Sequence, residues 1–221
     1  VMVARGDLGV ELPLERVPLI QKDVILKASQ ASKPVIIATQ ILDSMIKRPV
    51  PTRAEVSDIA NAILDGADTL MVTGETAAGK HPEKVIKVLN RVIKETESAI
   101  DYKEFYIEPD SENINIARAI SHAACSVAKD QGIKILVTMT HSGSTARMTA
   151  RYRPNARIIA MTPKKETCRQ LSIVWGVSSI LVDKYSSSNE IPDLANYVLN
   201  NKKLLKKNEK YVITGGVPVG V

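Results

Sequence analysis

Aromatic residues are scarce in this chain. Of its 221 residues only 4% are aromatic, with one Phe and one Trp, whereas 44% are hydrophobic. The core must therefore be assembled mainly from Ile, Val, Leu, Ala and Met. Aliphatic runs of this kind are typical of parallel sheets that are covered by helices on both faces. The composition thus favours an α/β protein.

Cysteines and long apolar runs are also lacking. The two cysteines, Cys125 and Cys168, follow neither a metal-ligand spacing nor a disulfide pattern, so we expect reduced thiols in a cytosolic protein. No run of about 18 apolar residues is present, which argues against a membrane span. The chain opens without a basic segment or a cleavage site, and we expect no signal peptide. A cytoplasmic protein without membrane contact is the expectation.

Acidic residues are fewer than basic residues, and the formal net charge is +6. Four lysines form a basic cluster near one expected helix end: Lys202, Lys203, Lys206 and Lys207. They fit a solvated face with cations at a helix C-terminus, or a nucleic-acid contact. No aromatic platform or binding motif accompanies them, so we expect no nucleic-acid partner. The positive excess also suits anionic, phosphorylated small molecules.

Strand-like and helix-like segments alternate along the chain, as in α/β proteins. Residues 1–101 form the first expected domain, and the polar segment 102–115 is interpreted as a connector. Thr52 with Glu55 makes a capping box, and Pro82 suits a first helical position. The expected strands are Val1–Ala4, Pro34–Thr39 and Thr69–Val72, and the expected helices are Leu14–Ala31, Thr52–Leu64 and Pro82–Ile100.

Residues 116–221 repeat the alternation. They predict a small doubly wound α/β domain of about five strands, with its last strand truncated at the end of the sequence. The first helix begins near Ile116 and ends at Gly132, which suits a C-terminal cap. The expected strands are Ile133–Met139, Arg157–Met161, Ser178–Val182 and Tyr211–Thr214, and the later helices are Ser144–Tyr152, Lys164–Ser172 and Ile191–Asn201.

Polar residues follow each of the first three expected strands. These are Arg5-Gly6-Asp7, then Thr39-Gln40, then Thr73-Gly74-Glu75-Thr76. Ligands of β/α folds gather beyond the carboxyl ends of parallel strands, so the three ends are expected to converge on one site.

Asp7 and Thr39 are the chemically most informative of these residues. Gly6 permits a close backbone approach, and a turn at Asp7 offers backbone N–H groups to an anion. The Asp7 carboxylate also suits a hard cation such as Mg²⁺. Alternatively, Asp7 only caps a helix and Thr39 is an ordinary strand-end hydroxyl.

Four motifs closely resemble the pyruvate kinase family. They are "MVARGDLGVELP", "KPVIIATQILDSMI", "PTRAEVSDIANAILDGADTLMVTGETAAGKHP" and "ARYRPNARIIAMTP". The resemblance runs nearly end to end. It implies a partial TIM-type barrel, the last three β/α units of the catalytic barrel, followed by most of the carboxy-terminal regulatory domain.

The resemblance also implies an activity and roles for the site residues. The family transfers the phosphoryl group of phosphoenolpyruvate to ADP, giving pyruvate and ATP, with Mg²⁺ (or Mn²⁺) and K⁺, and it forms tetramers. Asp7 matches the metal-binding aspartate. Gly6, Asp7 and Thr39 match the group that holds the substrate carboxylate, and Thr39 is implicated in proton delivery. Thr73 and Glu75 match the nucleotide side of the barrel mouth.

The family's phosphoryl-stabilising lysine, second metal-binding carboxylate and K⁺ ligands lie upstream of the segments matched here. We therefore expect this chain alone to be inactive, and its opening strand to belong to a barrel whose other strands are absent. The alternative function is a non-catalytic module that binds a phosphorylated metabolite and self-associates.

A second candidate site is the loop "THSGSTARM" in the second domain. Small hydroxyl residues and a glycine ahead of a helix can bind a phosphate, although a merely capped helix has the same pattern. In the family, this loop binds the phosphate of an allosteric effector. Ser144, Gly216 and Val217 stand where bisphosphate-binding members carry basic or aromatic residues, so a monophosphate such as AMP, ribose 5-phosphate or glucose 6-phosphate is expected. The matching residues are Thr140, Ser142, Gly143, Ser144 and Thr145.

Overall fold

The computed structural model describes residues 1–102, 115–185, 187–206 and 208–216. The chain divides into two compact units, Val1–Asp101 (unit 1) and Tyr102–Val221 (unit 2). Most of the expected connector 102–115, as well as Val217, lies outside the described residues. In the described part of the chain, no helix is both long and apolar enough to cross a membrane.

Unit 1 contains a parallel sheet in the order β1-β2-β3. Its strands are β1 (Met2–Ala4), β2 (Ile36–Ala38) and β3 (Thr69–Met71). Val3 lies opposite Ile37, and Ile37 lies opposite Leu70. The sheet is open in the described residues, which is consistent with the partial barrel expected from the sequence. Its helices are α1 (Arg5–Glu11), α2 (Val17–Gln30), α3 (Arg53–Leu64), α4 (Gly74–Ala77) and α5 (Pro82–Ser98), and its short 3-10 turns are η1 (Leu14–Arg16) and η2 (Asp43–Ile46).

The starts of α3 and α5 confirm two expectations from the sequence. The Thr52 hydroxyl accepts a hydrogen bond from the Glu55 N–H, and a Glu55 carboxylate oxygen accepts one from the Thr52 N–H at 2.7 Å. This reciprocal capping box satisfies two N–H groups that the helix cannot pair internally. Pro82 occupies the first position of α5, where a missing N–H costs nothing.

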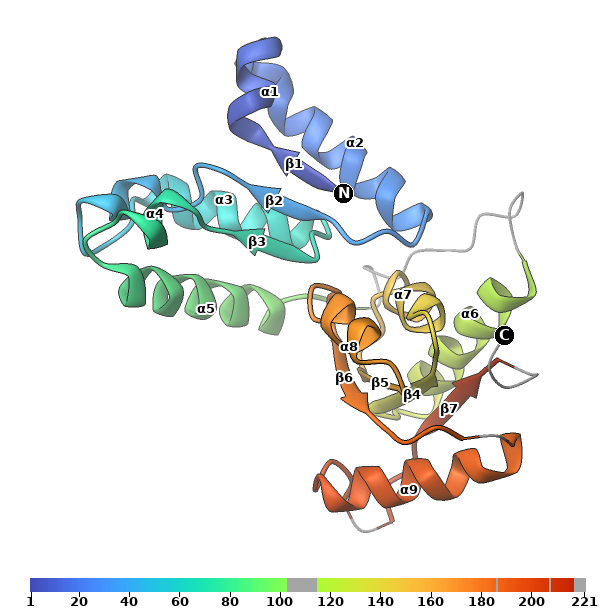
Figure 1. Cartoon of the computed structure of the whole chain (residues 1–221). Coiled ribbons are helices and arrows are strands. Elements are labelled where there is room, and N and C mark those ends of the chain that lie inside the picture. The colour runs from blue at the N-terminus through green and yellow to red at the C-terminus, as the bar shows by residue number, and fades with distance from the viewer. Residues whose placement is uncertain (103–114, 186, 207, 217–221) are drawn as a thin grey trace. The chain divides into compact units, whose positions relative to one another are not determined.

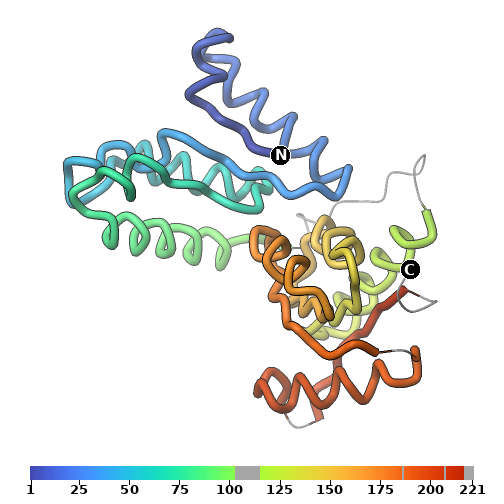
Figure 2. Tube along the Cα trace, in the orientation of Figure 1, coloured from blue at the N-terminus to red at the C-terminus, as the bar shows by residue number. Residues whose placement is uncertain are grey.

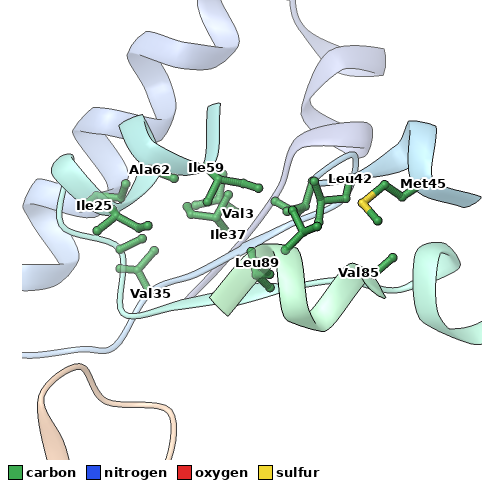
Figure 3. Close-up of a cluster of buried hydrophobic side chains, with 14 of the residues drawn as sticks. Val3, Ile25, Val35, Ile37, Leu42, Met45, Ile59, Ala62, Val85 and Leu89 are labelled. Carbon is green, nitrogen blue, oxygen red and sulfur yellow. The ribbon is translucent and has the colours of Figure 1, made fainter. Parts of the chain in front are cut away.

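The core of unit 1 forms between the sheet and the helices that cover one of its faces (Figure 3). Val3 and Ile37 from the strands pack against Ile25 of α2, Ile59 of α3 and Leu89 of α5. Figure 2 shows the first β/α unit, in dark blue, doubling back so that α2 runs beside β1. Met2, one residue from the buried Val3, remains 54% exposed, as the two-residue period of a strand requires when one face is left open.

Unit 2 is a doubly wound α/β domain with a parallel sheet in the order β6-β5-β4-β7. Among the described residues it has four strands, one at each of the four ranges expected from the sequence, where about five strands were expected in all. The strands are β4 (Ile135–Met139), β5 (Arg157–Thr162), β6 (Val177–Leu181) and β7 (Val212–Gly215). Its helices are α6 (Ile116–Asp130), α7 (Ser144–Ala150), α8 (Lys165–Leu171) and α9 (Ile191–Asn201), and η3 (Ser188–Glu190) is a 3-10 turn.

Alternate residues of these strands supply two separate cores. Leu136 and Ile158 face α6, α7 and α8, whereas Val137 and Ile159 face α9. Figure 1 shows α9 on the opposite side of the sheet from the other three helices. Burial on both faces explains why these strands read as continuous aliphatic runs.

The segment after β1 differs from the sequence-based expectation. Arg5–Glu11 forms the helix α1 where only a short turn was expected. The segment contains Gly6 and Gly9, and glycine is unfavourable in helices, so the local sequence does not predict α1. Tertiary contacts with α2 and β1 hold it in place instead.

Candidate functional site

The ends of β1 and β2 meet at Gly6 and Thr39. The N–H of Gly6 donates a hydrogen bond to the Thr39 hydroxyl at 2.8 Å. A methyl group built on Gly6 would lie 3.5 Å from the same oxygen, an ordinary van der Waals contact. Alanine would therefore fit at position 6 within this chain, and the advantage of glycine there lies in what else approaches the backbone.

Thr39 and Gln40 have an unusual backbone conformation. Their φ angles are +69° and +54°, in the left-handed region that β-branched residues in particular avoid. The turn ends β2 at Ala38, earlier than expected, and directs the Thr39 hydroxyl towards Gly6. Strain of this kind persists only where neighbouring groups hold it, and it concentrates at functional sites.

Arg5 is the group that holds this turn. Its guanidinium donates to the Thr39 carbonyl at 2.9 Å and to the Gln40 carbonyl at 3.1 Å. The same guanidinium donates to both carboxylate oxygens of Asp58 on α3 at 2.7 and 2.6 Å. With only 11% of its side chain exposed, Arg5 is fixed in one orientation between α3 and the end of β2.

Two carboxylates secure the continuation of the loop. Glu75, which is 3% exposed, accepts the N–H of Leu42 at 3.0 Å and the N–H of Thr73 at 2.9 Å. Glu55 accepts the N–H and the hydroxyl of Ser44 at 2.8 and 2.6 Å. Residues that follow β1 and β3, together with Glu55 of α3, thus act on one loop.

The hydrogen bonds decide the ionisation of both carboxyls. Burial works to raise the pKa of Glu75, but hydrogen bonds from the backbone of Leu42, Glu75 and Thr73 outweigh it and lower the pKa below its ordinary value. At Glu55, burial is likewise outweighed by hydrogen bonds from Ser44 and Thr52, and the pKa is lowered. Both groups are therefore carboxylates near neutral pH.

Asp7 lies in the first turn of α1 and is exposed. Its carboxylate fits the oxygen preference of Mg²⁺, but one carboxylate does not complete an octahedral shell. Within the described residues, no group of three or more His, Cys, Asp or Glu side chains is placed to hold a metal ion. Asp7 can therefore contribute a ligand, while the residues described here do not form a metal site by themselves.

Of the two residues expected on the nucleotide side, only one has an exposed side chain. Thr73 is exposed at the end of β3, whereas Glu75 is buried with both oxygens engaged. Arg5 was expected among the strand-end residues that converge here, whereas its partner Asp58 was not expected in the site. Arg5 directly precedes Gly6-Asp7, but its partner stands 53 residues away in the sequence, and no local spacing relates the two.

The loop after β4 brings the second set of candidate residues together. The Thr140 hydroxyl accepts the N–H of Gly143 at 2.9 Å, and Ser142 is exposed at its tip. Gly143 has φ +79°, and Ser144 and Thr145 begin α7. Arg147, which belongs to the quoted loop but was given no role from the sequence, donates to the Ser142 carbonyl at 3.1 Å and brings a positive charge to the loop.

Comparison with known proteins decides the family. Residues 1–86 match the model of the pyruvate kinase barrel domain, and residues 118–221 match that of the pyruvate kinase alpha/beta domain. The chain belongs to the pyruvate kinase family. This agrees with the motifs quoted above, and the two matched stretches lie in the two compact units.

Individual members of the pyruvate kinase family match the whole chain. The enzyme of Clostridium acetobutylicum is 43% identical over 100% of this chain and 47% of its own length, and that of Thermotoga maritima is 46% identical over 99% and 46%. The crystal structure of a pyruvate kinase from Cryptosporidium parvum superimposes with a TM-score of 0.92 at 38% identity, over 100% of this chain and 45% of that one. The chain thus spans about half the length of the relatives that it matches.

Proposed function

We propose that this chain forms part of a pyruvate kinase, which transfers the phosphoryl group of phosphoenolpyruvate to ADP and yields pyruvate and ATP. The observation that carries the proposal is the contact between Gly6 and Thr39 beside the exposed Asp7. It assembles a backbone N–H, a hydroxyl and a carboxylate at the carboxyl end of a parallel sheet, where β/α folds bind ligands. Family membership supports the same assignment.

Each residue has a role in this proposal. The backbone of Gly6 and Asp7, together with the Thr39 hydroxyl, holds the substrate carboxylate, with the Gly6 N–H shared between Thr39 Oγ1 and that carboxylate. Because Thr39 Oγ1 accepts from Gly6, its own proton remains available to donate, which suits proton delivery to the enol. Asp7 supplies one oxygen ligand to Mg²⁺ or Mn²⁺, which would neutralise charge on the transferring group. Thr73 lies on the nucleotide side, with Glu75 positioning the loop that carries Thr39.

The chain alone is proposed to be inactive. Phosphoryl transfer depends on positioned cations around the phosphates. The residues described here offer Asp7 as a metal ligand, and the remaining ligands for Mg²⁺ and K⁺ are assigned to sequence outside this chain. The whole enzyme is proposed to act in the cytoplasm as a homotetramer, which sedimentation of that enzyme would test.

A chimera tests the catalytic proposal directly. The matching segment of the Thermotoga maritima enzyme is replaced by this chain, and ATP formation from phosphoenolpyruvate and ADP is measured. We expect activity in the chimera, its loss with Asp7→Asn, and its retention with Asp43→Asn, which alters an exposed aspartate at the start of η2. Activity that survives Asp7→Asn would contradict the assignment of Asp7, and activity of the 221-residue chain alone would contradict the proposed inactivity.

A second function, binding of a phosphorylated effector, is favoured by the loop at Thr140–Thr145. Ser142, Ser144 and Thr145 are not buried, and Arg147 adds a cation. We propose that this loop binds the phosphate of a monophosphate such as AMP, ribose 5-phosphate or glucose 6-phosphate. Thermal melting of the chain with each compound tests it, with Thr145→Ala as the comparison. A melting temperature that none of the three compounds changes would contradict the effector proposal.

A further inference from the structure

Unit 2 has a cavity of about 300 Å³ that neither candidate site uses. It opens where β4, β5 and β6 begin: Lys134 precedes β4, Arg157 starts β5 and Gly176 precedes β6. Because these strands are parallel, their beginnings share one edge of the sheet, opposite the edge that carries the loop at Thr140–Thr145. The lining residues are Tyr102, Lys134, Pro154, Asn155, Ala156, Arg157, Trp175 and Gly176.

Two aromatic rings stand together in this cavity, in a chain with few aromatics. The ring centroids of Tyr102 and Trp175 are 6.2 Å apart, with a tilt of 36° between the rings. The guanidinium of Arg153, a residue that is 4% exposed, lies 4.8 Å from the centre of the Trp175 ring. This cation–π contact and the neighbouring ring fix the indole, so a flat, rigid apolar wall is available without further ordering.

The charged residues of the lining are all positive. Lys134 and Arg157 are exposed at the rim, and neither Asp nor Glu is among the lining residues. Arg157 is oriented by a hydrogen bond from its Nε to the Ser178 hydroxyl at 3.1 Å. The cavity thus combines an aromatic wall with two cations, and its volume is at the lower end of small-molecule sites.

We propose that this cavity binds a planar aromatic anion, that is, a flat ring system that carries one phosphate or carboxylate group. The ring would pack on Trp175 and Tyr102 while Lys134 and Arg157 contact the anionic group. Two sources share this chemistry, a nucleoside monophosphate and an aromatic carboxylate. The site is distinct from the effector loop and independent of the catalytic proposal.

Trp175, the chain's single tryptophan, is the reporter for the test. Its fluorescence is followed while the 221-residue chain is titrated with AMP or with 4-hydroxybenzoate, and with adenosine and inorganic phosphate as partial ligands. We expect saturable changes with AMP, with 4-hydroxybenzoate or with both, and affinities at least about tenfold weaker for adenosine and phosphate, the equivalent of ~1.4 kcal/mol. Which anion binds identifies the source. Absence of binding by both, or equal affinity for a partial ligand, would overturn the proposal.

Matched variants locate the binding event. Lys134→Gln and Arg157→Gln are each expected to weaken binding about tenfold, because each removes a charged contact to the anion. Lys202→Gln, a control at the C-terminal end of α9, is expected to leave it unchanged. Thr145→Ala alters only the effector loop. If that variant abolishes the fluorescence change while Lys134→Gln and Arg157→Gln preserve it, the ligand binds at the loop and the cavity proposal is wrong.

Discussion

The carboxylate of Asp58 lies 2.6 Å from the guanidinium of Arg5. The two residues come from different β/α units, since Arg5 follows β1 and Asp58 lies in α3. The same guanidinium binds the carbonyls of Thr39 and Gln40, so this ion pair stabilises the left-handed turn that presents the Thr39 hydroxyl.

Breaking the ion pair should destabilise unit 1. Asp58→Asn is expected to lower the free energy of unfolding by about 1–3 kcal/mol, because Arg5 keeps its charge but loses a charged partner in a mostly covered position. Urea denaturation followed by circular dichroism measures the change. The control Asp23→Asn breaks the exposed pair with Lys27 and should cost no more than about 0.5 kcal/mol. Equal losses in the two variants would contradict the structural role of Asp58.

Gly6→Ala should separate folding from ligand binding. A methyl group fits at position 6, and alanine is the better residue in α1, so the stability of the chain is expected to stay equal or rise by up to about 1 kcal/mol. In the chimeric enzyme, the same variant should reduce activity, because the added group occupies space beside the Thr39 hydroxyl. Parallel melting and activity measurements test this, and full activity of the variant would show that no ligand approaches Gly6.

Gly143 should be less tolerant of alanine than Gly132. Both have positive φ angles, +79° and +63°, so each substitution strains the backbone by about 1 kcal/mol. At Gly143 the added carbon would also lie 2.8 Å from the Arg147 guanidinium and 3.1 Å from Leu171, whereas nothing lies within 4 Å at Gly132. We expect Gly143→Ala to cost roughly 1–3 kcal/mol more. Equal costs in urea denaturation would mean that Leu171 and Arg147 move aside freely.

The lowered pKa of Glu75 predicts acid sensitivity. A carboxyl whose folded pKa lies below its unfolded value stabilises the fold fully above the unfolded value, and the contribution is lost as the pH falls through the folded pKa. Stability should therefore decline as the pH drops below about 4.5, the ordinary value. Glu75→Gln should lower stability at neutral pH, because the single amide oxygen replaces only one of the two carboxylate oxygens that accept the N–H groups of Leu42 and Thr73. It should also flatten the decline at low pH, because glutamine does not titrate. Glu83→Gln, which alters an 86% exposed side chain, is the control and should retain the full decline.

The edges of the three-stranded sheet predict self-association of the chain. β1 and β3 each have one neighbouring strand among the described residues, so backbone groups at the outer edges are left for other chains to pair with. Met2→Lys, on the half-exposed face of β1, should reduce concentration-dependent light scattering. Leu26→Lys changes a similarly exposed apolar residue on helix α2, whose backbone is paired within the helix, and should have little effect. Equal effects of both variants would point to general hydrophobicity rather than strand pairing.

Local rules predicted most of the helices and strands. The capping box of Thr52 and Glu55, the proline that opens α5 and the aliphatic runs of unit 2 each depend on residues close together in the sequence. The same reasoning did not find α1, whose glycines disfavour a helix and which tertiary packing stabilises. It also placed the end of β2 at Thr39 rather than at Ala38. The left-handed conformation of Thr39 depends on hydrogen bonds from residues distant in the sequence, not on the preference of threonine itself.

The candidate site was predicted in part for the same reason. Three strand ends with polar residues indicated where Gly6, Asp7 and Thr39 would gather, and the hydrogen bond from Gly6 to Thr39 brings two of them into contact. The roles of Asp58 and Glu75 in holding the loop depend on pairings across 53 and 33 residues. The cavity beside Trp175 likewise joins the beginnings of three strands and is visible only in the folded chain.

The loop from Thr39 to Ser44 is held from three directions, by Arg5 after β1, by Glu55 in α3 and by Glu75 after β3. These segments can therefore be inherited or exchanged only as a block. A recombinant whose crossover falls between Arg5 and Glu75 would combine the loop of one parent with hydrogen-bonding residues from the other. Crossovers placed after α5 leave the block intact, and this is where shuffled members of the family should retain function.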